Sequence, residues 1–138
     1  MALIAVALDT NAYTAFKLGR EEAREIIRRA DTIGLSAVVA GELLAGFAAG
    51  GQEKRNRSEF GRFLASPRVH VHAVSEVTAD YYARVYATLR AKGRPIPTND
   101  LWIAASALEH GQRLYSYDAH FADIDGLISG RSVGDFSL

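Results

Sequence analysis

ALIAVALDT, residues 2–10, is the stretch that decides the fold. A continuous apolar run of this length indicates a β-strand buried on both faces, as in a parallel sheet. Asp9 ends the run and no Lys or Arg precedes Lys17, whereas a signal peptide needs a basic start and a longer apolar stretch. No other stretch approaches the roughly 20 apolar residues of a membrane span. We therefore expect a cytoplasmic protein with no membrane partner.

Helical patterns and short strands alternate along the rest of the chain. Helices are predicted over residues 10–30 with a break at Gly19, and over 38–48, 52–64, 77–92 and 101–110. Strands are predicted over residues 33–36, 69–74, 113–116 and, near the end, 132–136. The helix over 38–48 is almost entirely apolar, so we expect it to be mostly buried. Strands separated by helices form βαβ units, which predicts an α/β fold with a parallel sheet.

Length and composition bound the function. The chain has 138 residues, which fits one domain over 1–138, with 16 Lys and Arg, 16 Asp and Glu, and no cysteine. The absence of cysteine excludes thiol nucleophiles, disulfides and Cys-based zinc sites. A net charge of zero argues against a generally basic nucleic-acid coat protein and against a polybasic membrane binder.

Four acidic residues are predicted to meet at one edge of the sheet. Asp9 and Asp118 follow strands, Asp100 opens the helix before the fourth strand, and Glu42 lies in an otherwise apolar helix. Ligands of parallel sheets bind beyond the carboxyl ends of the strands. Because no Lys or Arg stands beside them in the sequence, these carboxylates would repel one another unless a cation is present. Oxygen ligands of this kind favour Mg²⁺ or Mn²⁺.

Each aspartate also has a local structural explanation. Asp9 is a favoured helix N-cap, Asp100 suits the first turn of a helix, and Asp118 suits a turn. Glu42 has no such explanation, because an ionised carboxylate among apolar neighbours is costly unless it is paired or bound to metal. The prediction of a site therefore rests on the four residues together.

Four segments each surround one of the acidic residues. They are Leu8-Asp9-Thr10-Asn11, residues 36–46 around Glu42, residues 98–105 around Asp100, and residues 115–121 with 124–127 around Asp118. These segments resemble the motifs of the PIN-domain family, and specifically its VapC-type toxin ribonucleases. The resemblance spans nearly the whole chain, in the family's order. It implies a three-layer α/β/α sandwich around a central parallel sheet of four to five strands.

The same resemblance implies a metal-dependent endoribonuclease of a type II, VapBC-like toxin–antitoxin system. It places Mg²⁺ or Mn²⁺ at Asp9, Glu42, Asp100 and Asp118, with Thr10, Asn11 and Ser116 as supporting polar residues. Such an enzyme directs water at phosphorus in line. The implied partners are an RNA substrate, a cognate VapB-like antitoxin and a second copy of the chain in a homodimer.

Two alternatives stay open from the sequence. The first is a catalytically silent PIN-like module that binds or regulates without turnover. The second is a phosphoaspartate receiver domain, which is disfavoured because no Lys follows Lys92.

Further polar residues are candidates for contact with RNA. Lys54, Arg55 and Arg57 lie on the basic helix over 52–64, and Arg94 lies in the loop before Asp100. These cations are also explained as a solvated helix face. His120 is a further candidate, although an exposed loop histidine is the simpler interpretation. His70 and His72 form an H-x-H pair without an evident third ligand, so we interpret them as a solvated strand face.

Overall fold

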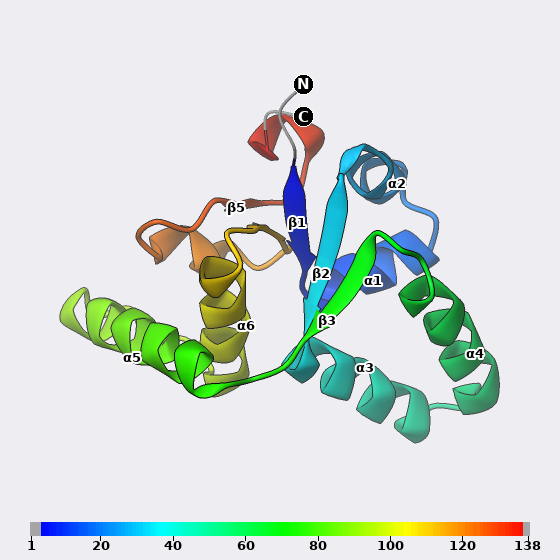
Figure 1. Ribbon diagram of the computed structural model, residues 1–138, viewed down its shortest axis with the longest axis horizontal. Coiled ribbons are helices and arrows are strands. Elements are labelled where there is room, and N and C mark those ends of the chain that lie inside the picture. The colour runs from blue at the N-terminus through cyan, green and yellow to red at the C-terminus, as the bar shows by residue number, and fades with distance from the viewer. Residues whose placement is uncertain (1–3, 137–138) are drawn as a thin grey trace.

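A five-stranded parallel sheet forms the centre of the computed structural model, which describes residues 4–136 (Figure 1). Its strands lie in the order β3-β2-β1-β4-β5, and every neighbouring pair is parallel. Their bounds are β1 (Ala5–Leu8), β2 (Thr32–Ser36), β3 (Val69–His72), β4 (Arg113–Tyr115) and β5 (Ser129–Gly130). The predicted α/β fold with a central parallel sheet is confirmed.

Helices cover both faces of this sheet, with α5 and α6 to its left in Figure 1 and α1, α2 and α4 to its right. Their bounds are α1 (Thr10–Lys17), α2 (Glu21–Arg29), α3 (Ala37–Ala49), α4 (Glu53–Leu64), α5 (Glu76–Ala91) and α6 (Thr98–Glu109). The predicted break at Gly19 separates α1 from α2, and its φ of +79° is a left-handed conformation that glycine adopts without strain. Within residues 4–136, no helix has the length and apolar character needed to cross a membrane.

The core forms where the central strands meet helices from both sides. Leu8, Ile33 and Leu114 come from three adjacent strands, and Ile26 of α2 and Ile103 of α6 pack against them with at most 2% of their surface exposed. Each such side chain contributes roughly 1.5–3 kcal/mol by leaving water. The predicted strand at the start of the chain is buried over Val6–Leu8, while its residues 2 and 3 lie outside the described residues.

The prediction that the helix over 38–48 is mostly buried is wrong. Only Val39 and Leu43 of α3 are buried. Phe47 near the end of α3 packs against Phe60 of α4, with ring centroids 6.1 Å apart. The apolar appearance of α3 in the sequence comes largely from Ala and Gly, which lose little when they face water. Its outward face therefore needs no cover.

The predicted strand over 132–136 is also wrong. The last strand is β5, and residues Val133–Phe136 form a 3₁₀ helix, η2. The Asp135 carboxylate accepts hydrogen bonds from the backbone N–H groups of Arg131 and Ser132, and these bonds curl the chain into a turn. Phe136 is then buried against the ring of Tyr115. A side chain that closes a turn thus outweighs the strand propensity of this segment.

Candidate active site

A cleft of about 610 Å³ opens at the carboxyl end of the sheet, and all four predicted carboxylates line it. Asp9 follows β1, Asp118 follows β4, Asp100 lies in the first turn of α6, and Glu42 lies in α3 after β2. The other lining residues are Thr10, Asn11, Thr14, Ala15, Leu18, Arg20 and Tyr117. The structure therefore brings together the residues that the sequence placed on four separate segments.

Asp9 is the most buried of the four, with 3% of its surface exposed. It is the N-cap of α1, because its Oδ1 accepts a hydrogen bond from the Thr10 N–H at 2.8 Å. Its Oδ2 accepts a second bond from the Ser116 hydroxyl at 2.6 Å. Burial raises the pKa of Asp9 to about 6 despite these bonds, and the charges of Asp100 and Asp118 add to the rise. A buried carboxylate with a raised pKa in a cleft is a functional candidate as well as a cap.

Two polar side chains hold the carboxylate of Glu42. The Thr10 hydroxyl donates to Oε1 at 2.5 Å, and the Asn99 amide donates to Oε2 at 3.2 Å. The sequence analysis did not single out Asn99, although its position beside Asp100 in the first turn of α6 is a signal that could have found it. The two bonds explain how a glutamate is accommodated in the apolar segment of α3.

Asp118 is exposed and lies within a short hydrogen-bond network. The Asn11 amide donates to its carboxylate at 3.4 Å, and the Asn11 carbonyl oxygen accepts from the Tyr117 N–H at 3.1 Å. The Ser116 hydroxyl oxygen accepts from the Asp118 N–H at 3.0 Å. Each of the three predicted supporting residues, Thr10, Asn11 and Ser116, therefore contacts at least one of the four acidic residues.

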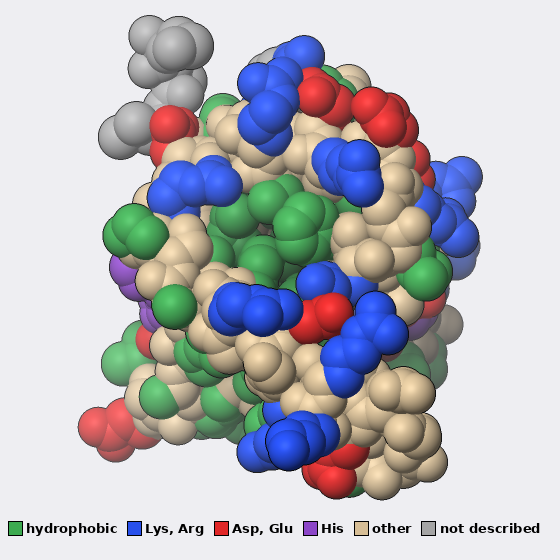
Figure 2. All heavy atoms as spheres, turned by 90° about the vertical axis from the view of Figure 1, so that its right-hand side faces the viewer, with side chains coloured by type: hydrophobic (Ala, Val, Ile, Leu, Met, Phe, Trp, Pro, Cys, Tyr) green, Lys and Arg blue, Asp and Glu red, His purple; other side chains and the backbone are tan. Residues whose placement is uncertain are grey.

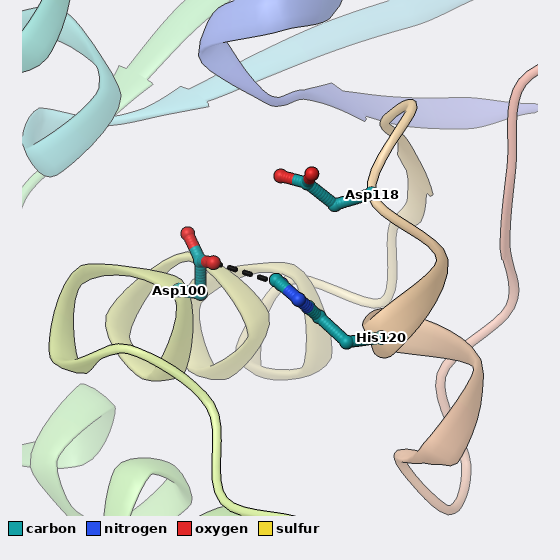
Figure 3. Close-up of side chains that lie close together, drawn as sticks. All are labelled: Asp100, Asp118 and His120. Atoms are coloured by element: carbon teal, nitrogen blue, oxygen red, sulfur yellow. Dashed lines mark ion pairs between the residues drawn. The ribbon is translucent and has the colours of Figure 1, made fainter.

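His120 reaches the carboxylate of Asp100, as Figure 3 shows. Its Nε2 lies 2.8 Å from Oδ2 of Asp100, and this buried atom has no other partner among residues 4–136. Burial raises the pKa of Asp100, His120 opposes the rise, and the charges of Asp118 and Glu42 support it.

The interpretation of His120 as an exposed loop residue is wrong. The side chain is 34% exposed, because it belongs to the 3₁₀ helix η1 (Ala119–Asp123), which turns the chain back toward α6. The next residue, Phe121, is fully buried.

The chemistry of this donor set fits a divalent cation. Ligand atoms of Asp100, Asp118 and His120 all lie within 4.8 Å of one another. Carboxylate oxygens are the ligands that Mg²⁺ and Mn²⁺ prefer. The imidazole Nε2 is a further atom able to ligate. A cation would also relieve the mutual repulsion that contributes to the raised pKa values of Asp9 and Asp100.

The cleft is also lined by Arg20, which the sequence analysis missed. No Lys or Arg stands beside the four carboxylates in the sequence, but Arg20 lines the same cleft in the structure. The guanidinium carbon lies 5.5 Å from the centroid of the Tyr117 ring. The turn at Gly19, which the sequence did show, is what aims this residue at the cleft.

The cations predicted to contact RNA do not line this cleft. Lys54, Arg55 and Arg57 lie on α4, where Arg55 pairs with Glu59 at 3.3 Å and lines a neighbouring cleft of about 410 Å³. Arg94 lies 4.0 Å from Asp123. Figure 2 shows Lys and Arg side chains around an apolar hollow on the face that carries α2 and α4. Of the predicted contacts, only His120 touches one of the four acidic residues.

His70 and His72 do not form a metal pair. His70 is exposed, whereas the ring of His72 stacks on that of His110 with centroids 3.6 Å apart and Nε2 lies 3.2 Å from the Gln112 amide. The polar face of β3 is therefore solvated at one histidine and packed at the other.

Residues 6–127 match the sequence model of the PIN domain. The chain belongs to the PIN-domain family. Ribonuclease VapC5 of Mycobacterium tuberculosis is 28% identical to this PIN domain over 122 residues, which cover 88% of this chain and 89% of that protein. Ribonuclease VapC4 of the same organism is 32% identical over 90 residues, or 64% of this chain and 68% of the relative.

A solved structure agrees with these relatives. The crystal structure of VapBC2 from Rickettsia felis, bound to a DNA fragment from their promoter, contains a chain that matches this PIN domain with a TM-score of 0.81 at 26% identity. The match covers 94% of this chain and 99% of the other. The resemblance to VapC-type PIN toxins that the sequence motifs indicated is confirmed.

Proposed function

We propose that this PIN domain is a metal-dependent endoribonuclease and the toxin of a type II, VapBC-like toxin–antitoxin system. The observation that carries the proposal is the convergence of Asp9, Glu42, Asp100 and Asp118 on one cleft. The similarity to VapC ribonucleases supports the reaction class. We propose Mg²⁺ or Mn²⁺ as the ion, since the donor set is dominated by carboxylate oxygens.

In this proposal, Asp9 and Asp100 hold the principal cation, and Glu42 and Asp118 complete the acidic pocket directly or through water. A bound divalent cation supplies Lewis-acid stabilisation of the charge that develops on the phosphate oxygens. The Ser116 hydroxyl and the Thr10 N–H fix both oxygens of Asp9. Because the pKa of Asp9 is about 6, its carboxylate is mostly ionised at pH 7.5 and available as a ligand.

Two further polar residues orient the remaining carboxylates. Thr10 and Asn99 bind opposite oxygens of Glu42, so its carboxylate cannot rotate freely. Asn11 links the carboxylate of Asp118 to the backbone of Tyr117. These contacts preorganise the charges before any ligand arrives, which is the condition for electrostatic catalysis.

The experiment is a cleavage assay on total RNA with the purified chain, with and without EDTA. We expect cleavage with Mg²⁺ or Mn²⁺, none with EDTA, and none with Asp100→Asn. Asp80→Asn is the matched control, because Asp80 is an exposed carboxylate of α5 that does not line the cleft. A folded wild-type chain that cleaves no RNA with either metal would instead support the catalytically silent module.

The proposed partners follow from the same assignment. We propose that the chain acts in the cytoplasm on RNA, pairs with a VapB-like antitoxin encoded beside it, and forms a homodimer. The VapBC2 complex of Rickettsia felis supports an antitoxin partner. Co-purification with the product of the neighbouring reading frame, and loss of cleavage in that complex, tests the antitoxin. Light scattering at micromolar concentration tests the dimer, which a monomer mass would contradict.

We also propose that residues 1–138 form a single PIN domain. The family match over residues 6–127 and the one core cluster support this extent. One cooperative unfolding transition, seen by two different probes, is the expected result. Two separate unfolding transitions would show that the chain has two domains and would contradict the proposal.

A further inference from the structure

Arg20 stands at the end of a tight turn that aims it at the acidic cleft. It is the N-cap residue of α2 and follows Gly19, whose φ is +79°. Among the described residues that line the cleft, Arg20 is the one Lys or Arg, and it faces a set that includes four carboxylates. A lone cation on the wall of an anionic cleft would attract an anionic ligand that the carboxylates repel.

The guanidinium of Arg20 is available for a ligand. It forms no ion pair within 4.0 Å with any carboxylate of residues 4–136. Its neighbours are the ring of Tyr117, 5.5 Å from the guanidinium carbon, and the carboxylate of Glu22, whose pKa the charge of Arg20 helps to lower. Stacking on a tyrosine ring holds an arginine in place and leaves its N–H donors free. Two of these donors can bind two oxygens of one phosphate at the same time.

Tyr117 in turn is held at both ends. Its hydroxyl donates to Glu22 at 2.9 Å and lies 2.7 Å from the Tyr115 hydroxyl. Its backbone N–H donates to Asn11, which also contacts Asp118. The ring beneath Arg20 is therefore fixed relative to the acidic residues, so the distance between the cation and the carboxylates is set by the fold.

We propose that Arg20, positioned by Tyr117, is a second phosphate-binding point of this cleft, which holds a backbone phosphate of the RNA next to the one at the carboxylates. The inference rests on the proposed ribonuclease function and deepens it. The carboxylates and their cation take the scissile phosphate, and Arg20 takes the phosphate next to it. Arg20 is thus a substrate-binding residue, and Tyr117 is a positioning residue.

The test measures RNA binding separately from cleavage. Fluorescence anisotropy with a short single-stranded RNA is carried out in the Asp100→Asn background, and KM and kcat are measured in the wild-type background. Arg20→Ala is expected to weaken binding about tenfold or more, as expected for loss of a charge-assisted hydrogen bond. It should raise KM with little change in kcat. The slope of log affinity against log salt should fall by about 0.7, the value for one phosphate contact of a single strand.

Two further variants make the result specific. Arg20→Lys keeps the charge but loses the planar fork, so it should keep the salt slope and lose part of the affinity. Arg84→Ala is the matched control, because Arg84 also lies over a tyrosine, 5.0 Å from the Tyr81 ring centroid, but it does not line this cleft. Its RNA binding should stay within twofold of the parent. Thermal unfolding of each variant shows that the fold is kept.

The outcomes separate this inference from the proposed function. If the wild-type chain cleaves RNA and Arg20→Ala matches Arg84→Ala in binding, KM and salt slope, the phosphate-binding role is overturned and the ribonuclease stands. A loss in kcat with unchanged binding overturns it too. If Arg20→Ala weakens only the complex with a protein partner, Arg20 belongs to that interface instead. If the chain binds RNA through Arg20 but never cleaves it, the inference holds and the ribonuclease assignment fails.

Discussion

Replacement of Asp9 by asparagine should stabilise the protein in the absence of metal while it abolishes cleavage. Burial raises the pKa of this carboxylate from its ordinary 3.8 to about 6. The folded state therefore holds the proton more tightly than the unfolded state does, and stability falls as pH rises between about 3.8 and about 6. Above pH 6 the fold carries the full cost of an ionised, buried Asp9.

The size of the effect follows from that rise in pKa. A tenfold change in a proton dissociation constant is worth about 1.4 kcal/mol, so the ionised carboxylate costs the fold about 3 kcal/mol at pH 7.5. Asparagine removes the charge and is still a favoured N-cap. Its single acceptor oxygen cannot serve both the Thr10 N–H and the Ser116 hydroxyl, which forfeits about 1 kcal/mol. The expected net gain is about 2 kcal/mol, or roughly 5–10 °C in Tm for a chain of this size.

The assay is thermal and urea unfolding of the wild type and Asp9→Asn in EDTA at pH 5 and pH 7.5. The wild type should be less stable at pH 7.5, and the variant should lose most of this pH dependence. Added Mg²⁺ should raise the Tm of the wild type alone. Asp135→Asn is a control of opposite sign, because hydrogen bonds from the backbone of Arg131 and other donors lower the pKa of Asp135. An Asp9→Asn variant less stable than the wild type in EDTA at pH 7.5 would refute this reasoning.

Two further substitutions test contacts around the cleft, and a third tests the packing of β2 against Gln112. Ser116→Ala removes a buried hydrogen-bond donor to Asp9, so it should lower the free energy of unfolding by about 1–3 kcal/mol and shift the pH midpoint of cleavage upward. Ser116→Thr keeps the hydroxyl and should behave as the wild type. Glu42→Gln should reduce kcat about 10- to 100-fold, because a neutral amide replaces one of the charges of the acidic cleft. The free energy of unfolding should change by less than about 1 kcal/mol, because glutamine keeps an acceptor for Asn99. Gly34→Ala places a Cβ 2.1 Å from Nε2 of Gln112 and should cost about 1–3 kcal/mol in urea unfolding. Adding Gln112→Ala should recover most of that loss, and no recovery would mean that the backbone, rather than the amide, is the obstacle.

The fold was predictable from the sequence wherever burial sets the pattern. The apolar run ending at Asp9 predicts the central strand, and Gly19 predicts the break between two helices, because both signals act locally. The predictions were wrong where a residue's role depends on distant partners. The exposure of α3 follows from where it lies relative to the sheet, and the turn at residues 131–135 follows from one carboxylate that binds two backbone N–H groups.

The site shows the same division. The four acidic positions were found because strand ends of a parallel sheet converge, and Glu42 was conspicuous against its apolar neighbours. Arg20 and the contact of His120 with Asp100 were missed, because each depends on the path of a turn that periodicity does not encode. Asn99 was missed although it lies beside Asp100 in α6, because its role depends on contact with Glu42 of another helix. Motif resemblance indicated the acidic residues and the supporting Thr10 and Asn11, whereas Arg20 became evident only once the cleft was formed.

The net charge of zero acquires a physical meaning once the charges are placed. Without the four carboxylates of the cleft, the chain has 16 basic and 12 acidic residues. The four acidic residues that cancel this excess lie together in the cleft. There they destabilise the fold, because burial and mutual repulsion raise the pKa values of Asp9 and Asp100. A cation that binds there relieves this cost and leaves a moderately basic surface, with Arg20 in the cleft itself. Metal binding would thus neutralise the four carboxylates, which stabilises the fold and also lets the cleft bind a polyanion. Because both effects have this one cause, the rise in Tm and the gain in RNA binding should have the same midpoint in metal concentration.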